Sequence, residues 1–225
     1  MIVAGVDGCR GGWIMVARDL ARGRWSVHGA ADWAGLPRAD IVAVDMPIGL
    51  PDAGRRGVDF DARRLLGPKR SASVFIGLRR PLLSFPDYPT ANAWGKADGC
   101  GLAKQAWFLL PKIREIDQAI RPADQDRVRE SHPELAFMRL AGAPVPESKR
   151  TPEGEAVRRR LLSTAGFDVD GLLSALDRRH AAPDDLFDAA ALSDTAANMA
   201  AGTAVRLPAG EPPRDSRGLR MEIWY

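Results

Sequence analysis

Two short apolar runs, MIVAGV at residues 1–6 and IVAV at residues 41–44, limit the possible folds of this chain more than any other feature of its sequence. Each run is followed directly by an aspartate, Asp7 after the first and Asp45 after the second. Short, continuous apolar runs are typical of strands that are buried on both faces. A sheet built on such strands needs helices on both sides, so the sequence predicts an α/β fold.

The remaining elements are predicted from periodicity and from turn residues. Residues 12–20 and 24–32 are rich in β-forming residues and predict two strands that form a meander with the first strand. From residue 52 onward the pattern becomes helical, with a short strand expected just before His132 and a long alanine-rich helix that begins at Pro183. The ending GLRMEIWY alternates, so we expect a strand at a sheet edge or against a neighbouring subunit, with Met221 and Ile223 buried.

Composition excludes several classes of protein. The chain has 225 residues, of which 45% are hydrophobic and 27% charged, as in ordinary globular proteins. Its two cysteines are far apart, which argues against a zinc module or a disulfide framework. No apolar run reaches the roughly 18 residues that span a bilayer, and the N-terminus does not resemble a signal peptide. We therefore expect a cytoplasmic protein without a membrane partner. The net charge of +3 is only weak support for nucleic acid as a partner.

The acidic residues carry the strongest chemical signal. Asp185 and Asp188 are three residues apart at the start of the last helix, so they share one helix face. Asp7 and Asp45 each follow a strand. Taken singly, each of these acids is also explained as a turn or cap residue. Together they form a rarer combination, because clustered carboxylates need cations between them, and Mg²⁺ prefers oxygen ligands.

A second polar group lies in the segment ESHPEL at residues 130–135. In an extended strand Glu130, His132 and Glu134 would share one face. His132 could transfer a proton near neutral pH, and Glu134 could be a metal ligand or a base. Both are also explained as structural residues at the end of a strand. Five basic residues are candidates for phosphate contact or are solvated surface charges: Arg63, Lys104, Lys112, Lys149 and Arg158. Trp13 and Trp107 could stack on bases or pack in the core.

The motifs GVDGCRGGW, VDMPIGLP, LLPKIRE, VRESHPELAF and DLFDAAA make the chain similar to the family labelled domain of unknown function 429. Members of that family are described as predicted ribonuclease H-like nucleases. The resemblance implies a mixed sheet with flanking helices and a largely helical second half. It also implies one ribonuclease H-like domain over residues 1–225, with a helical insertion at roughly 52–125. In resolvase-type members of that fold, one acid lies on the first strand, one on the fourth and a D-x-x-D pair on a late helix. Asp7, Asp45, Asp185 and Asp188 match that pattern.

The resemblance implies a metal-dependent nuclease that uses two Mg²⁺ or Mn²⁺ ions to hydrolyse a phosphodiester. Asp7 would bridge the ions, Asp45 and Asp188 would be further ligands, and Asp185 or Glu134 would complete the set. DNA and RNA both remain open as partners, as does a homodimer. Two alternatives are kept. The glycines at residues 8–12 could bind nucleotide phosphates as in actin-like ATPases and sugar kinases, or the chain could be a non-catalytic interaction module.

Overall fold

The computed structural model describes all residues from Met1 to Tyr225 and contains seven strands and seven α-helices. The strands are β1 (Ile2–Cys9), β2 (Gly12–Asp19), β3 (Arg24–Ala30), β4 (Ile41–Val44), β5 (Val128–Glu130), β6 (Arg206–Leu207) and β7 (Ile223–Trp224). The helices are α1 (Gly57–Arg70), α2 (Tyr88–Ala97), α3 (Lys104–Ala119), α4 (Pro133–Ala141), α5 (Pro152–Thr164), α6 (Val169–Ala175) and α7 (Pro183–Ala200).

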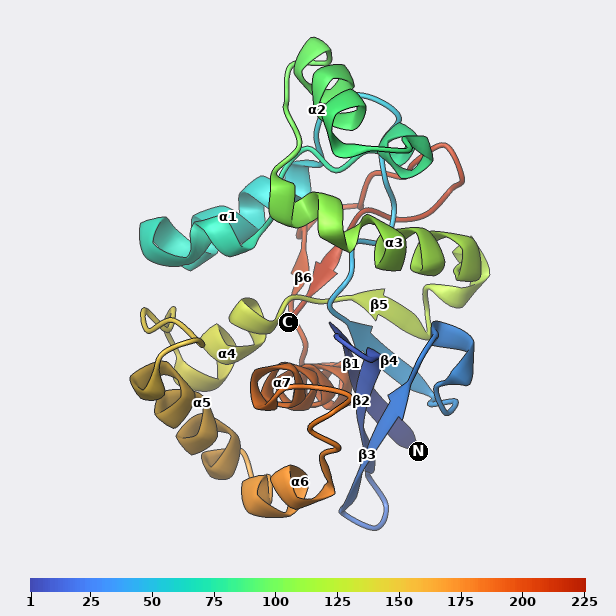
Figure 1. The fold of residues 1–225 in the computed structure, drawn as a ribbon. Helices are drawn as coiled ribbons and strands as arrows, with labels where there is room; N and C mark the ends of the chain where they lie inside the picture. The colour runs from blue at the N-terminus through green and yellow to red at the C-terminus, as the bar shows by residue number, and fades with distance from the viewer.

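Five strands form one mixed sheet in the order β3-β2-β1-β4-β5 (Figure 1). The first three strands are antiparallel neighbours, as the predicted meander requires, and β4 and β5 run parallel to β1. The predicted α/β fold is therefore confirmed. The parallel part of the sheet positions the candidate site, because the carboxyl ends of β1, β4 and β5 lie at one edge.

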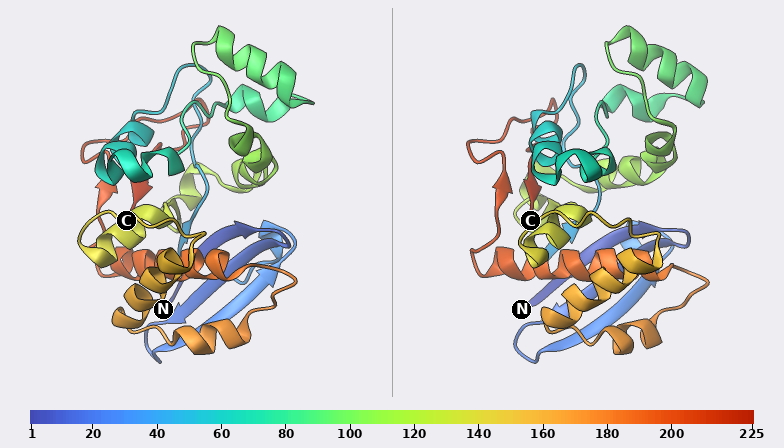
Figure 2. Two further views of the ribbon diagram at one scale, coloured as in Figure 1. Left: turned by 60° about the vertical axis from the view of Figure 1, so that its left-hand side comes forward. Right: turned by 90° about the vertical axis from the view of Figure 1, so that its left-hand side faces the viewer.

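Helices cover both faces of this sheet, as the apolar strands require. On one face α3 packs its buried side chains, such as Leu110 and Ile113, against Val6 and Val44. On the other face α7 packs against Val3 and Ala43, with α4 and α5 against α7 and α6 against β3. Figure 2 shows α7 lying along the sheet, with α1, α2 and α3 gathered at the opposite side of the molecule.

The helical segments agree well with the sequence. The region between β4 and β5 contains α1, α2 and α3, and α3 runs through Pro111 without a break. β5 is followed directly by α4, and α7 begins at Pro183. None of the helices combines the length and the apolar character that a bilayer-spanning segment needs.

The C-terminal strand differs from the prediction. β7 pairs with β6 in a separate two-stranded sheet and not with an edge of the main sheet, although a single parallel bridge joins Trp224 to Ser131 just after β5. Ile223 is buried, as expected, but Met221 is only half-buried. The reason is that Met221 precedes the short paired segment, so the alternation of a regular strand does not extend to it.

Candidate functional site

Asp7 and Asp45 lie side by side where the parallel pairing of β1 with β4 ends; Asp7 is inside β1, which continues to Cys9, and Asp45 directly follows β4. Val6 of β1 is the register partner of Val44 of β4, and the Asp45 N–H donates to the Val6 carbonyl at 2.9 Å. Side chains alternate along a strand, so the next residue of each strand points away from the face that Val6 and Val44 occupy. Both carboxylates therefore project from the face that α7 covers.

Gly5 brings α7 close to Asp7. A Cβ atom at Gly5 would lie 2.0 Å from the Ala189 carbonyl oxygen and 2.2 Å from the Ser193 nitrogen, so only glycine permits this contact. Gly5 and Asp7 are two residues apart and share one face of β1. Since Ala189 rests on Gly5, its neighbour Asp188 is carried to the end of the strand where Asp7 lies.

The carboxylates influence one another strongly. Burial raises the pKa of Asp7 well above its usual range, and the charges of Asp45, Asp188 and Asp185 raise it further. Burial also raises the pKa of Asp188, to about 7, although Lys149 lowers it. The pKa of Asp45 is raised by burial against the opposing effects of His132 and Lys149. The negative charges of these acids thus act on one another, and a cation bound between them would reduce their repulsion.

Lys149 is the cation that partly neutralises these acids. Its Nζ donates to Asp188 Oδ2 and lies 3.8 Å from Asp184 Oδ2. Burial alone lowers the pKa of Lys149, but the charges of Asp188 and Asp7 outweigh burial, so the net shift is upward. The second oxygen of Asp188, Oδ1, is buried and has no hydrogen-bond partner. An orphaned carboxylate oxygen of this kind is costly to bury and needs an explanation.

Asp185 lies at the rim of the same site. Its Oδ2 accepts a hydrogen bond from the Ala182 N–H at 3.0 Å, which caps the start of α7. Burial raises its pKa, an effect that the Ala182 hydrogen bond opposes. It therefore combines a structural role with a position next to the acids, and it contributes negative charge felt by Asp7.

Glu134 and His132 are engaged by other protein groups. The Glu134 carboxylate accepts from Arg158 Nη2 at 2.9 and 3.0 Å and also pairs with Arg70, and Glu134 and Arg158 are both buried. His132 Nδ1 accepts from the Glu134 N–H at 3.2 Å, and its Nε2 donates to the Ser73 carbonyl at 3.3 Å. His132 thereby caps α4. Both of its ring nitrogens already have partners.

The glycines after Asp7 are covered by side chains. A Cβ at Gly8 would meet the Lys112 side chain at 2.6 Å, and one at Gly11 would meet the His180 ring at 2.3 Å. Lys112 donates from Nζ to the Gly12 carbonyl and lies 4.8 Å from the centre of the Trp13 ring, which is fully buried. The glycines therefore serve close packing, and they do not present an open row of N–H groups to a phosphate.

The other basic candidates have different surroundings. Arg158 is buried and forms a salt bridge with Glu134, and Lys149 forms one with Asp188. Arg63 Nε donates to the Val74 carbonyl at 2.9 Å. Lys104 is exposed at the start of α3. Trp107 is half-buried and packs edge-on against Tyr88.

A brace that sequence reasoning missed fixes the chain just after Asp45. Glu130 accepts from Arg56 Nη2 at 2.6 Å and from the Ile48 N–H at 2.8 Å, and Arg56 also donates to the Gly49 carbonyl at 3.3 Å. Asp59 completes the brace at 3.1 Å from Arg56. Of these residues, the sequence points only to Glu130, as part of a polar trio. Arg56 and Asp59 lie more than 70 residues before it, in a segment that gave no sign of a partner.

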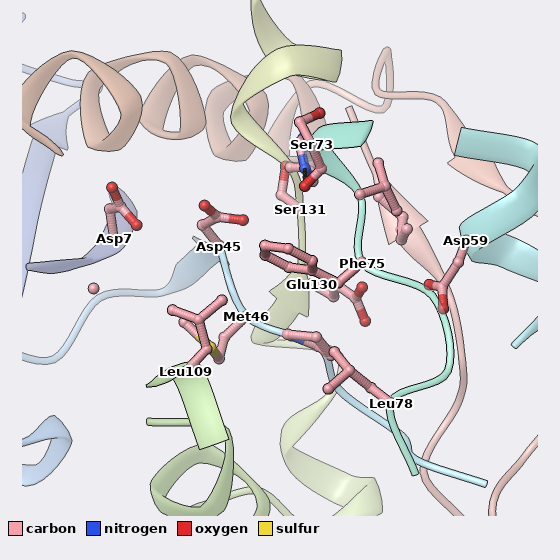
Figure 3. Close-up of a pocket in the computed structure, with 15 residues that line it drawn as sticks. Asp7, Asp45, Met46, Asp59, Ser73, Phe75, Leu78, Leu109, Glu130 and Ser131 are labelled. Carbon is pink, nitrogen blue, oxygen red and sulfur yellow. Dashed lines mark hydrogen bonds between the residues drawn. The ribbon is translucent and has the colours of Figure 1, made fainter. Parts of the chain in front are cut away.

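A pocket of about 110 Å³ runs from the acids to this brace. Figure 3 shows Asp7 and Asp45 near one another on one side, with Glu130 and Asp59 farther along and Phe75 between. Glu134, Asp185 and Asp188 do not line this pocket, whereas His132 does. The acids of α7 therefore approach Asp7 from outside the pocket.

The donor set suits a hard divalent cation, although no three His, Cys, Asp or Glu side chains are gathered closely enough to form a ready metal cage. Carboxylate oxygens are the ligands that Mg²⁺ and Mn²⁺ prefer. No protein group bonds to the side chains of Asp7 or Asp45, and Asp188 Oδ1 has no partner either. The chemistry of these oxygens fits a metal, with Lys149 as the cation that reduces repulsion in its absence.

Comparison with known proteins places the chain in a family. Searches of the curated proteins and of the solved structures found no match. The model of a family described as protein of unknown function (DUF429) matches residues 5–213. The match includes all four aspartates, Lys149 and the Arg56–Glu130 brace, and it ends before β7. Because this match covers most of the chain, the chain belongs to the DUF429 family.

Proposed function

We propose that this protein is a metal-dependent phosphodiesterase that acts on nucleic acid. The observation that carries the proposal is the meeting of Asp7 and Asp45, at the ends of two adjacent parallel strands, with Asp188 of α7, whose Oδ1 is buried without a partner. The strand order β3-β2-β1-β4-β5, with β4 and β5 parallel to β1, supports a ribonuclease H-like arrangement.

Asp7, Asp45 and Asp188 would hold Mg²⁺ or Mn²⁺, with Asp185 at the rim. When bound, such an ion supplies a Lewis acid that polarises a phosphoryl oxygen and lowers the pKa of a water molecule. The protein contributes rigid placement, because two of the acids lie at strand ends and the third lies on a helix packed on glycine. Lys149 orients Asp188 and limits the repulsion between the acids.

Glu134 and His132 have structural roles in this proposal. The charge of Glu134 is balanced by two arginines, and His132 has partners on both ring nitrogens. The alternative of a phosphate-binding hairpin is less well supported, because Lys112 and His180 cover Gly8 and Gly11.

Replacement of Asp7 by asparagine tests the proposal. Asp7→Asn keeps the size of the side chain and removes one negative charge, so we expect a folded protein whose Mn²⁺ affinity in calorimetry is at least about tenfold weaker. Any Mn²⁺-dependent cleavage of DNA or RNA should fall by at least about a hundredfold, as expected for a group that acts on transition-state charge.

Asp194→Asn is a matched control, because Asp194 lies on α7 but is hydrogen-bonded to Asn198. It should bind Mn²⁺ like the unaltered protein. Equal Mn²⁺ affinity in the Asp7→Asn and Asp194→Asn proteins would contradict the proposed site. No heat of Mn²⁺ binding to the unaltered protein would favour a non-catalytic interaction module.

A further inference from the structure

Beyond Asp7 and Asp45 the pocket has an apolar wall, to which six of its fifteen lining residues belong, and a polar part that includes Asp59, Glu130 and His132. Met46, Val74, Phe75, Leu78 and Leu109 supply its walls, from three separate parts of the chain (Figure 3). A phosphodiester held by the acids alone would need none of these groups. Apolar walls with a few polar groups are typical of a site for a small organic ring.

The size of the pocket limits what can enter. Its volume is about 110 Å³. A protein cavity of roughly 150 Å³ accommodates one benzene molecule. The pocket therefore accepts about one planar ring with part of that ring open to solvent, and a base pair cannot fit. A nucleotide whose base enters this pocket must be unpaired and unstacked.

The far end of the pocket has polar groups that suit the edge of a nucleobase. Asp59 is 4% exposed, and its carboxylate bonds only to Arg56, at 3.1 Å. One carboxylate oxygen of this buried side chain is thus left for a ligand. Ionised carboxylates accept hydrogen bonds, and every nucleobase has at least one N–H donor on its pairing edge.

We propose that this pocket binds the base of one unpaired nucleotide, whose phosphodiester lies at Asp7 and Asp45. The proposal rests on the proposed function, and it names the substrate class as single-stranded nucleic acid. Phe75 and Leu109 contact the faces of the base, and Asp59 accepts from its edge. Bases in a duplex would first have to leave the stack, at a cost of a few kcal/mol.

Two ligands that differ only in the base test this proposal. Thymidine 5′-monophosphate and 2-deoxyribose 5-phosphate are titrated into the protein with Mn²⁺ present, and binding is followed by calorimetry. We expect thymidine 5′-monophosphate to bind at least about tenfold more tightly, as base–aromatic contacts usually provide. Phe75→Ala should reduce that difference to less than about threefold without changing the affinity for 2-deoxyribose 5-phosphate.

Two adjacent positions on α3 give a matched pair of variants. Leu109 lines the pocket, whereas Phe108 is 68% exposed to solvent. Leu109→Trp should remove the preference for the base-containing ligand by filling the pocket, and Phe108→Trp should keep it. Both proteins should retain Mn²⁺ binding, which shows that the acids are intact.

The outcomes separate the two proposals. Equal affinity of the unaltered protein for the two phosphates overturns the base pocket and leaves the metal site standing. A preference that survives in both Leu109→Trp and Phe75→Ala also overturns the base pocket, because the base is then bound elsewhere. If neither phosphate binds with Mn²⁺, the proposed function fails and the base pocket fails with it.

Discussion

The two carboxylate oxygens of Asp188 have different surroundings, and this difference has consequences for stability. Oδ2 pairs with Lys149, but Oδ1 is buried without a partner. Burial raises the pKa of Asp188 to about 7 in the folded protein, although Lys149 lowers it. An aspartate in an unfolded chain titrates near 4. Between about pH 4 and pH 7 the folded protein therefore binds more protons than the unfolded chain.

The free energy of unfolding of the metal-free protein should consequently fall as the pH rises through this window, because the folded state loses its extra proton. We expect a loss on the order of 1–3 kcal/mol between pH 5 and pH 7.5. Urea unfolding in the presence of a chelator measures it. Asp188→Asn should show a smaller loss, since its side chain does not titrate. The same pH dependence in both proteins would contradict the assignment to Asp188.

At the scale of single residues, the sequence predicted the acids better than their partners. Asp7 and Asp45 could be placed because each directly follows an apolar strand. Glu134 could not be assigned, because its partners Arg70 and Arg158 come from α1 and α5 and only tertiary packing brings them together. The importance of Asp59 was missed for the same reason, since its neighbour Arg56 is defined by contacts with Glu130 in β5.

Among the elements, the contact of α7 with β1 decides where the site forms. Gly5 allows the backbone of α7 to rest directly on the strand, with the Ala189 carbonyl oxygen 2.0 Å from the position of a Cβ atom. No rotamer change relieves that contact, because the obstructing atoms belong to the backbone. A larger residue at this position has to move the helix.

Gly5→Ala should therefore lower the free energy of unfolding by about 1–3 kcal/mol or more, as overpacking in a core does. It should also weaken Mn²⁺ binding, because Asp188 moves with α7. Gly57→Ala is the control, since no atom lies within 4 Å of a Cβ at Gly57. Urea unfolding and calorimetry give the two measurements. A Gly5→Ala protein with unchanged Mn²⁺ affinity would show that α7 does not position a ligand.

The elements themselves were mostly predictable. The strands β1, β2, β3 and β4 and the helix α7 follow from apolar runs and from a proline at a helix start. A strand at the C-terminus was expected from the alternation in GLRMEIWY, but β6 and its pairing with β7 were not, because they depend on contacts between distant segments. The proximity of α7 to Asp7 was expected only from the resemblance to a family, and the role of Gly5 was not foreseen.

For the molecule as a whole, metal binding should be coupled to folding. The acids are brought together only in the folded state, so we expect Mn²⁺ to bind that state in preference to the unfolded chain. At a concentration of Mn²⁺ about 100 times its Kd, the stabilisation is roughly 2.7 kcal/mol. For a chain of this length that corresponds to a rise in Tm of about 5–10 °C.

Thermal unfolding at increasing Mn²⁺ concentration measures this effect. Ca²⁺ in place of Mn²⁺ tests the preference for a small ion, and Asp7→Asn should lose most of the rise in Tm. A Tm that does not change at millimolar Mn²⁺ would contradict a metal site made of these acids.

The overall architecture was predicted correctly because it depends on patterns that extend along the chain. Strands without polar alternation require a sheet with two covered faces, and the two buried clusters on either side of the sheet satisfy that requirement. The pocket was not predicted. Its apolar wall comes from α3 and from the segments that follow β4 and α1, so its shape is a product of packing and not of any one motif.

The packing of α7 on Gly5 also determines when the acidic site can form during synthesis of the protein. Asp7 and Asp45 are synthesised well before Asp188, which follows Asp45 by 143 residues. The strands can pair during translation, since domains acquire structure from the N-terminus onward. The growing chain nevertheless cannot bring Asp188 to Asp7 and Asp45 until α7 has packed against β1. Any activity that depends on these acids therefore begins only after α7 has been synthesised and has packed against β1.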